Sequence, residues 1–232
     1  MKMRARFFLL LLIIGCAHRY YMGPWRPEPE DRQVSEVQVL DDGTTVFTRE
    51  RLEISLRPMT DEELNRQFAA YSNAGIFSTN PYTYGNWVPP GEDRPPQRFT
   101  VFKLKVKNYT YPKVLVDPSQ MVAVAQNGRV YHPLTLSDLR DYYIRFVIGY
   151  AGNVNARYEE RMDILKRTLY HAEPIFSGQE REGYVVFPVF HKDVKEVKII
   201  LKNVVLRSDY QGNPLETMDV VFRFHRKVEA VR

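Results

Sequence analysis

Between residues 99 and 108 the sequence alternates apolar and charged side chains with the two-residue period of a β-strand. Phe102, Leu104 and Val106 fall on one side, opposite Lys103, Lys105 and Lys107. Successive side chains of a strand point to opposite faces of its sheet, so this pattern predicts one face on a core and one in water. Val101 is out of step with the alternation. The segment is typical of an antiparallel sheet.

Short apolar runs separated by turns recur along most of the chain. Residues 37–40 and 44–47 flank Asp41-Asp42-Gly43, and Asp-Gly supplies the positive φ angles that a hairpin turn needs. Residues 52–56 alternate as a half-buried strand, which we expect Pro58 to end. Further runs lie at residues 114–116, 121–125, 130–132, 184–187, 197–201, 204–206 and 220–224. Strands at this spacing, without alternating helices, predict a mainly β fold, an antiparallel sandwich over residues 35–232.

Helical patterns occur in two places. Thr60 and Glu63 have the spacing of a capping box, which predicts a short helix to about Tyr71. Residues 134–172 predict an inserted helical hairpin, with one helix capped at Ser137-Asp138 and a second from about residue 156 to 170. We expect this hairpin to lie over one edge or open end of the sandwich.

The stretch Pro174–Gly178, followed by Gly183–Phe187, resembles the turn-into-strand element of immunoglobulin-like domains in exported bacterial lipoproteins. Together with the strand ending at Asn108, the resemblance covers about a third of the chain. It implies an immunoglobulin-like β-sandwich, from which the helical insertion departs. No functional residue is carried over from it.

The N-terminus has the parts of an export signal. Met1–Arg6 is basic and Phe7–Ile14 is continuously apolar. Ile13-Ile14-Gly15-Cys16 then resembles the lipobox of bacterial lipoproteins. The resemblance implies that residues 1–15 are a signal peptide cleaved between Gly15 and Cys16, and that diacylglycerol on the Cys16 sulfur attaches the protein to a membrane.

Two other interpretations of the N-terminus compete. A transmembrane helix is too short, because about 11 residues span about 16 Å and the hydrocarbon core is about 30 Å thick. An ordinary signal cleaved after Ala17 would remove Cys16, the only cysteine of the chain. In the lipoprotein family, an aspartate after the cysteine often marks retention in the inner membrane. Ala17 therefore favours the outer membrane, facing the periplasm, in an organism with two membranes.

Residues 16–34 are predicted to be a flexible tether. Pro24, Pro27 and Pro29 exclude a regular helix there. The aromatic rings of this segment either lie at the level of the lipid headgroups or pack onto the domain. They belong to Tyr20, Tyr21 and Trp25.

The charge pattern argues against a nucleic-acid partner. The formal net charge is +5, but Lys2, Arg4 and Arg6 lie in the signal. The remaining 30 basic and 28 acidic side chains are interspersed, with no run that would follow a phosphate backbone.

No catalytic, metal-binding or cofactor motif is found. The five histidines are scattered, and neither a Gly-x-Ser-x-Gly elbow nor a Gly-rich phosphate loop occurs. An envelope hydrolase remains an alternative, and a cleft that gathers His132, His171 or His191 with a carboxylate would favour it.

The candidate partner-binding residues are aromatic. Residues 72–98, the aromatic loop, are too long for an ordinary connection and rich in rings. The loop either closes a second core over the helices or presents rings to an envelope protein, or to a glycan such as peptidoglycan. The residues are Phe77, Tyr82, Tyr84 and Trp87 of the loop, with Tyr142 and Tyr150 of the helical insertion. We expect a membrane-anchored, non-enzymatic component of an envelope complex.

Overall fold

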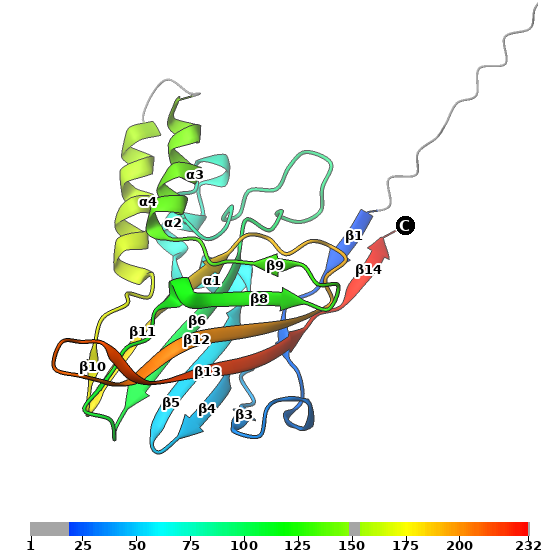
Figure 1. The fold of residues 1–232 in the computed structure, drawn as a ribbon. Coiled ribbons are helices and arrows are strands. Elements are labelled where there is room, and N and C mark those ends of the chain that lie inside the picture. The colour runs from blue at the N-terminus through cyan, green and yellow to red at the C-terminus, as the bar shows by residue number, and fades with distance from the viewer. Residues whose placement is uncertain (1–18, 149–153, 232) are drawn as a thin grey trace, which may run out of the picture.

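Two antiparallel sheets face each other in a computed structural model that describes residues 19–148 and 154–231 (Figure 1). The first has the order β11-β6-β5-β4-β3 and the second the order β2-β13-β12-β8-β9, five strands each. The first sheet consists of β3 (Val37–Val39), β4 (Thr45–Arg49), β5 (Leu52–Met59), β6 (Thr100–Asn108) and β11 (Gln179–Phe187). The second consists of β2 (Arg26–Pro27), β8 (Met121–Ala125), β9 (Val130–Tyr131), β12 (Glu196–Ser208) and β13 (Pro214–His225). The prediction of a mainly β sandwich is confirmed.

Smaller elements complete the fold. Two short ribbons pair β1 (Arg19–Met22) with β14 (Val228–Val231), and β7 (Lys113–Val114) with β10 (Ile175–Phe176). The α-helices are α1 (Asp61–Gln67), α2 (Ala69–Ser72), α3 (Leu136–Ile148) and α4 (Val154–Thr168). Single 3₁₀ turns are η1 (Glu30–Arg32), η2 (Gly75–Phe77) and η3 (Pro118–Gln120).

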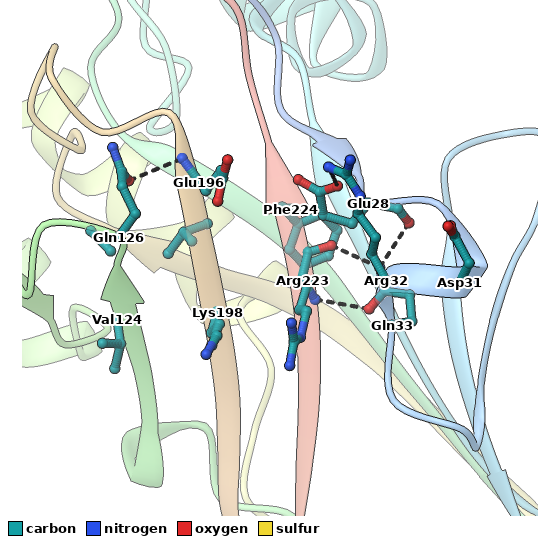
Figure 2. Close-up of a pocket in the computed structure, with 12 residues that line it drawn as sticks. Glu28, Asp31, Arg32, Gln33, Val124, Gln126, Glu196, Lys198, Arg223 and Phe224 are labelled. Carbon is teal, nitrogen blue, oxygen red and sulfur yellow. Dashed lines mark hydrogen bonds and ion pairs between the residues drawn. The ribbon is translucent and has the colours of Figure 1, made fainter.

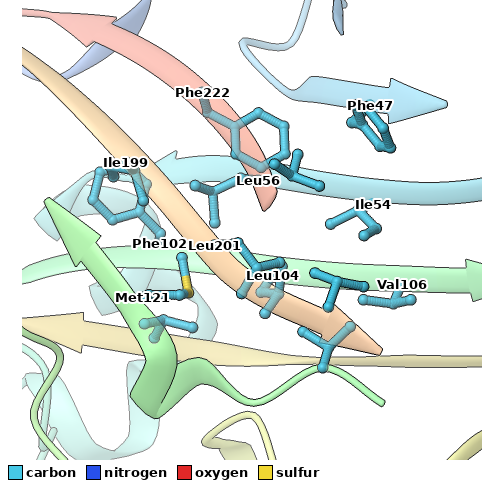
Figure 3. Close-up of a cluster of buried hydrophobic side chains, with 14 of the residues drawn as sticks. Phe47, Ile54, Leu56, Phe102, Leu104, Val106, Met121, Ile199, Leu201 and Phe222 are labelled. Atoms are coloured by element: carbon cyan, nitrogen blue, oxygen red, sulfur yellow. The ribbon is translucent and has the colours of Figure 1, made fainter. Parts of the chain in front are cut away.

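The main core fills the space between the two sheets. Its side chains come from alternate positions of the strands, as the two-residue period requires (Figure 3). Phe102, Leu104 and Val106 of β6 are fully buried there, opposite Ile199 and Phe222 of the second sheet. The charged positions between them face outward, where Lys103, Lys105 and Lys107 pair with Glu182, Glu180 and Glu53.

A second core lies on the other face of the first sheet, under the helices. Val101, the residue that breaks the alternation of β6, is buried in it beside Val186 of β11. Leu139 of α3 and Leu165 of α4 cover them. The first sheet is therefore buried on both faces at the end where β6 and β11 lie under the helical hairpin.

Local signals placed several elements correctly. Gly43 has a φ angle of 80° in the turn between β3 and β4. Thr60 and Glu63 form the complete capping box at the start of α1. The first inserted helix is capped differently from our expectation of Ser137-Asp138. The Asp138 N–H donates to the Thr135 hydroxyl, and the Asp138 carboxylate accepts from the Thr135 N–H, so the cap is Thr135, two residues before Ser137.

Two strands differ from their predicted lengths. β5 continues through Pro58 to Met59, because a proline can lie in a strand where its nitrogen is not needed as a donor. The runs 197–201 and 204–206 form one strand, β12, with a bulge between them. Asn203 has a φ angle of 55° in this bulge, and its N–H donates to the Asp219 carboxylate at 2.9 Å.

The prediction of a flexible tether is wrong for residues 19–34. β1 pairs with β14 from Arg19 to Met22, and β2 pairs with β13 at the edge of the second sheet. Prolines exclude a helix but are tolerated in an edge strand, so a proline-rich composition does not distinguish a flexible tether from β1 and β2. Trp25 is buried, with its ring 5.6 Å from that of Phe190. The lipobox, including Gly15 and Cys16, and the rest of the predicted tether to residue 18 lie outside the described residues, as does Tyr150.

Candidate functional site: the aromatic loop and its neighbours

The aromatic loop is held in place by buried polar side chains. The Asn80 side-chain Nδ2 donates to the Ser72 hydroxyl at 3.0 Å, and its side-chain Oδ1 accepts from the N–H of Tyr82 at 2.9 Å. The Asn86 N–H donates to the Ser72 carbonyl at 2.8 Å. Between them Gly85 has a φ angle of 63°, and an added Cβ there would lie 2.4 Å from the Ser72 carbonyl oxygen. The loop therefore has a defined shape despite its lack of periodicity.

Tyr82 is part of the second core and not of the surface. It is fully buried, with its ring 5.5 Å from that of Phe68 and 4.9 Å from that of Tyr184. Its hydroxyl lies 2.6 Å from that of Thr168 at the end of α4. The prediction that Tyr82 contacts a partner is wrong, because the loop folds back over the helices and needs this ring to fill the space between them.

Arg98 lies among the aromatic rings at the end of the loop. Its guanidinium is 4.0 Å from the centre of the Tyr84 ring and donates to the Tyr143 hydroxyl at 3.0 Å. It also donates to the backbone carbonyl of Asn80 at 3.2 Å. A second cation, Arg161 of α4, lies over the Tyr143 ring at 5.2 Å. Neither arginine was expected at this site from the sequence, although arginines close to aromatic residues commonly stack on their rings.

The rings of Tyr84, Trp87 and Tyr142 are half-buried rather than free. Tyr84 and Trp87 pack against each other at 5.6 Å, and Tyr142 packs on Phe99 at 5.1 Å. The side chains of Tyr84 and Tyr142 also hydrogen-bond to each other. These three candidates therefore both close the second core and contribute to its outer surface, so the two interpretations of the loop are compatible.

The most exposed apolar residues of the loop are adjacent. Ile76 and Phe77, which we call the apolar tip, are 68% and 56% exposed in the η2 turn. Arg157 of α4 lies over the Phe77 ring at 4.3 Å. The Gly75 N–H donates to the Asn86 side chain at 2.8 Å, which fixes the turn. Two large apolar side chains are thus presented in a fixed geometry next to a cation.

Asp61, the first residue of α1, has unusual electrostatics. Burial raises the pKa of its carboxyl to about 7, the negative charge of Glu62 acts in the same direction, and Arg98 opposes the shift. The folded state therefore retains this proton to a higher pH than the unfolded chain does. For an acid with a raised pKa, stability is lost as the pH rises from about 4 to about 7.

We expect Asp61→Asn to become relatively more stable as the pH increases. At about pH 8 the free energy of unfolding of the variant should exceed that of the wild type by about 1–3 kcal/mol. This gain is smaller than the pKa shift alone implies, because the variant loses the attraction of the carboxylate to the helix dipole. At about pH 4 the difference should disappear. Urea unfolding at several pH values measures it, and a difference independent of pH would contradict the proposed burial of the charge.

A groove with a volume of about 550 Å³ lies on the outer face of the second sheet (Figure 2). Cations and anions alternate around it, among them Arg32, Lys198, Arg223, Glu28 and Glu196. Part of its polar lining holds the fold together. The Gln33 side chain donates to the Arg223 carbonyl at 2.8 Å and accepts from the Arg223 N–H at 3.0 Å, which ties η1 to β13. Because the lining carries both positive and negative side chains, it does not indicate whether a ligand would be an anion or a cation.

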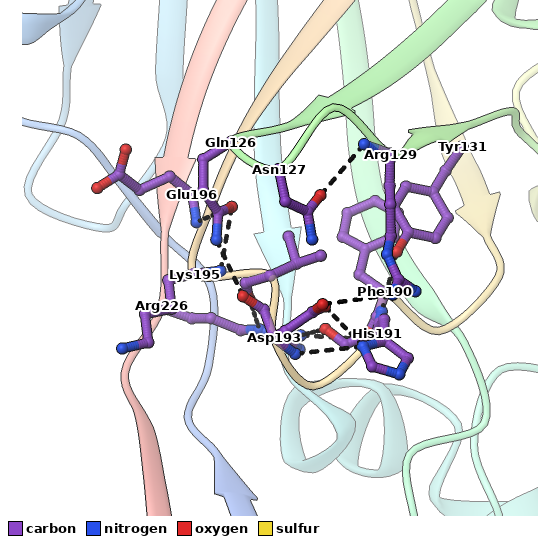
Figure 4. Close-up of polar contacts among 11 residues, drawn as sticks. Gln126, Asn127, Arg129, Tyr131, Phe190, His191, Asp193, Lys195, Glu196 and Arg226 are labelled. Atoms are coloured by element: carbon purple, nitrogen blue, oxygen red, sulfur yellow. Dashed lines mark hydrogen bonds and ion pairs between the residues drawn. The ribbon is translucent and has the colours of Figure 1, made fainter.

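A polar cluster lies at the end of the sandwich, in the loop between β11 and β12 (Figure 4). Arg226 is only 4% exposed and donates to the carbonyls of Val194, Phe190 and His191 at 2.8, 3.0 and 2.7 Å. Its guanidinium lies 4.6 Å from the Trp25 ring centre. Burial lowers the pKa of Arg226 to about 10, so it stays charged at neutral pH. Arg226 thus joins the loop to the N-terminal segment.

His191 and Asp193 form a pair in the same loop, with 2.6 Å between imidazole Nδ1 and carboxylate Oδ1. Arg129 also binds this carboxylate, at 3.3 Å. Hydrolysis by such a pair needs a nucleophile at the other imidazole nitrogen. In residues 19–148 and 154–231 no Ser or Thr side chain hydrogen-bonds to His191, and the pair is exposed. His132 and His171 do not join it in any interaction of the described residues.

Two further features are not found in residues 19–148 and 154–231. No group of three or more His, Cys, Asp or Glu side chains is arranged to hold a metal ion within these ranges. No helix among the same residues has the length and apolar character needed to cross a membrane.

Comparison with known proteins gives little further information. No protein-family model matches the sequence, and no curated protein matches it. A similar solved structure is that of MPT63, a secreted protein from Mycobacterium tuberculosis, at 13% identity and a TM-score of 0.30. The match covers 76% of this chain and 88% of the other. A likeness this distant carries no argument about function.

Proposed function

We propose that this chain is an exported lipoprotein, anchored through Cys16, whose β-sandwich binds an envelope protein without catalysing a reaction. Export and anchoring are supported by the sequence Ile13-Ile14-Gly15-Cys16 after a basic and apolar leader. The protein belongs at the outer membrane, facing the periplasm, if the organism has two membranes. The sandwich is of the immunoglobulin-like type, in keeping with its two facing antiparallel sheets.

The apolar tip carries the proposal of a protein partner. Ile76 and Phe77 are large and exposed, and a fixed turn holds them. Their burial against a partner therefore costs this chain little conformational entropy. Because Ile76 and Phe77 are already partly buried, burying the rest of both side chains contributes about 2–4 kcal/mol at the usual values. Aromatic anchors next to an arginine are typical of the energetic centre of protein interfaces. Arg157 supplies that cation.

Photo-crosslinking in cells tests this proposal. A photoreactive amino acid in place of Ala74, an exposed residue directly before η2, should trap one discrete protein and leaves the Asn86 hydrogen bond to the turn intact. Ile76→Ser combined with Phe77→Ser should reduce that product at least about tenfold, since the burial energy is lost. The variant should unfold within about 0.5 kcal/mol of the wild type, because both side chains are exposed.

Phe176→Ala is the matched control. Phe176 lies in β10 and is 52% exposed, nearly as much as Phe77. Its replacement removes a similar apolar area from another part of the surface and should leave the cross-linked product unchanged. An equal loss in both variants, or no discrete product at all, would contradict binding through the apolar tip.

A further inference from the structure

The folded body begins close to the proposed lipid. Cys16 precedes Arg19, the first residue of β1, by three positions. A chain spans at most about 3.6 Å per residue, so this segment reaches about 11 Å at full extension. β1 is paired with β14 along its whole length. With a lipid on Cys16 the sandwich is therefore held at the bilayer surface rather than on a long tether.

β1 presents two exposed tyrosines, one on each face of the β1–β14 ribbon, and each contacts a cation from a distant part of the chain. Tyr20 is 45% exposed, with the Lys192 ammonium 4.6 Å from its ring centre. Tyr21 is 38% exposed, with the Arg94 guanidinium 4.4 Å from its ring centre. Aromatic rings with a polar tip, next to Lys or Arg, are the groups favoured at the level of lipid headgroups.

We propose that this end of the sandwich docks on anionic lipid headgroups, through Tyr20, Tyr21, Arg94 and Lys192. The inference rests on the proposed lipid anchor and adds an orientation to it. Attached acyl chains provide most of the binding energy, whereas each cation near an anionic surface adds about 1 kcal/mol. The acidic neighbours Glu92 and Asp93 limit the net charge of the face, so its contribution is to orientation more than to affinity.

Orientation has a direct consequence for the rest of the molecule. The turn between β12 and β13 lies at the opposite end of the sheets from the β1–β14 ribbon (Figure 1). Tyr210 in this turn is 94% exposed. Docking therefore directs Tyr210 away from the bilayer, and this gives the experiment its reference position.

Depth-dependent quenching tests the proposal on the full lipidated protein. Cys16 is the only natural cysteine, so once it is lipidated an introduced cysteine is the only free thiol. Asp93→Cys and Tyr210→Cys are labelled with the same fluorophore. The proteins are reconstituted in vesicles of phosphatidylethanolamine and phosphatidylglycerol in equal parts, with a nitroxide quencher on the headgroups. Arg94 contacts Tyr21, five positions after Cys16, so the anchor alone already keeps residue 93 near the bilayer, and charge-reversal variants are needed to separate docking from tethering.

We expect quenching at residue 93 to exceed that at residue 210 several-fold. Arg94→Glu combined with Lys192→Glu should lower this ratio, because docking is lost while the anchor remains, and Lys202→Glu on β12 should leave it unchanged. Equal quenching at both positions, with the fatty acid confirmed on Cys16 by mass measurement, overturns the docked orientation and leaves the anchor intact. A mature N-terminus without lipid overturns both the anchor and the orientation.

Discussion

Gly183→Ala should lower the free energy of unfolding by more than about 3 kcal/mol, as expected for a buried backbone clash. A Cβ atom at this position of β11 would lie 2.5 Å from both the Cα and the N of Tyr170. Neither neighbour is the end of a flexible side chain, so the backbone after α4 would have to move. The Tyr170 N–H donates to the Tyr184 carbonyl at 2.9 Å, and this hydrogen bond attaches the end of the helical hairpin to the first sheet.

Urea unfolding followed by circular dichroism measures the effect of Gly183→Ala. The matched control is Gly23→Ala, where an added Cβ meets the Lys227 carbonyl oxygen at 3.4 Å, an ordinary contact. We expect this control to differ from the wild type by less than about 1 kcal/mol. Wild-type stability in Gly183→Ala would show that residues 169–170 do not pass this close to β11.

Arg226→Met should destabilise the protein by about 3–5 kcal/mol, the usual loss when one partner of a buried charged network is removed. Three backbone carbonyls of the loop between β11 and β12 would lose their donor. Trp25 would also lose the cation over its ring. Methionine keeps most of the apolar volume of the side chain, so the loss is one of hydrogen bonds and charge.

Two related variants separate the causes. Arg226→Lys retains the charge but cannot reach three carbonyls in a planar fork, so its stability should be intermediate. Arg207→Met removes an exposed arginine that pairs with Glu216 at 3.4 Å, and should cost at most about 1 kcal/mol. Thermal unfolding of the three variants gives the order of their stabilities. A loss no larger for Arg226→Met than for Arg207→Met would contradict the structural role of Arg226.

These two positions hold the parts of the molecule on which the functional proposals depend. Gly183 allows the helical layer and the aromatic loop to pack on the first sheet. Arg226 fixes the loop that carries Lys192, which contacts Tyr20 in β1. Partial loss of either attachment should therefore affect the apolar tip or the proposed membrane-facing end, even though neither residue is exposed.

Much of the candidate site could not be located from sequence. Phe77 and Tyr82 are both aromatic and five positions apart in one loop, yet one is exposed and the other fully buried. No local pattern distinguishes them, because burial depends on where α3 and α4 cross the loop. The contacts of Arg98 with Tyr84 and Tyr143 likewise join segments that only the fold brings together.

The sequence by itself determined the local elements of this protein. The two-residue period specifies β6, Gly43 specifies the turn between β3 and β4, and Thr60 with Glu63 specifies the start of α1, since each depends on residues close together in the chain. Only the tertiary structure decided the partners of these elements. The proline-rich segment 19–34 pairs with the C-terminal strands because free sheet edges are available there, and Val101 is buried because helices from a later part of the chain cover the first sheet. Such contacts between distant segments depend on the shape of the assembled sheets, and no short stretch of sequence encodes that shape.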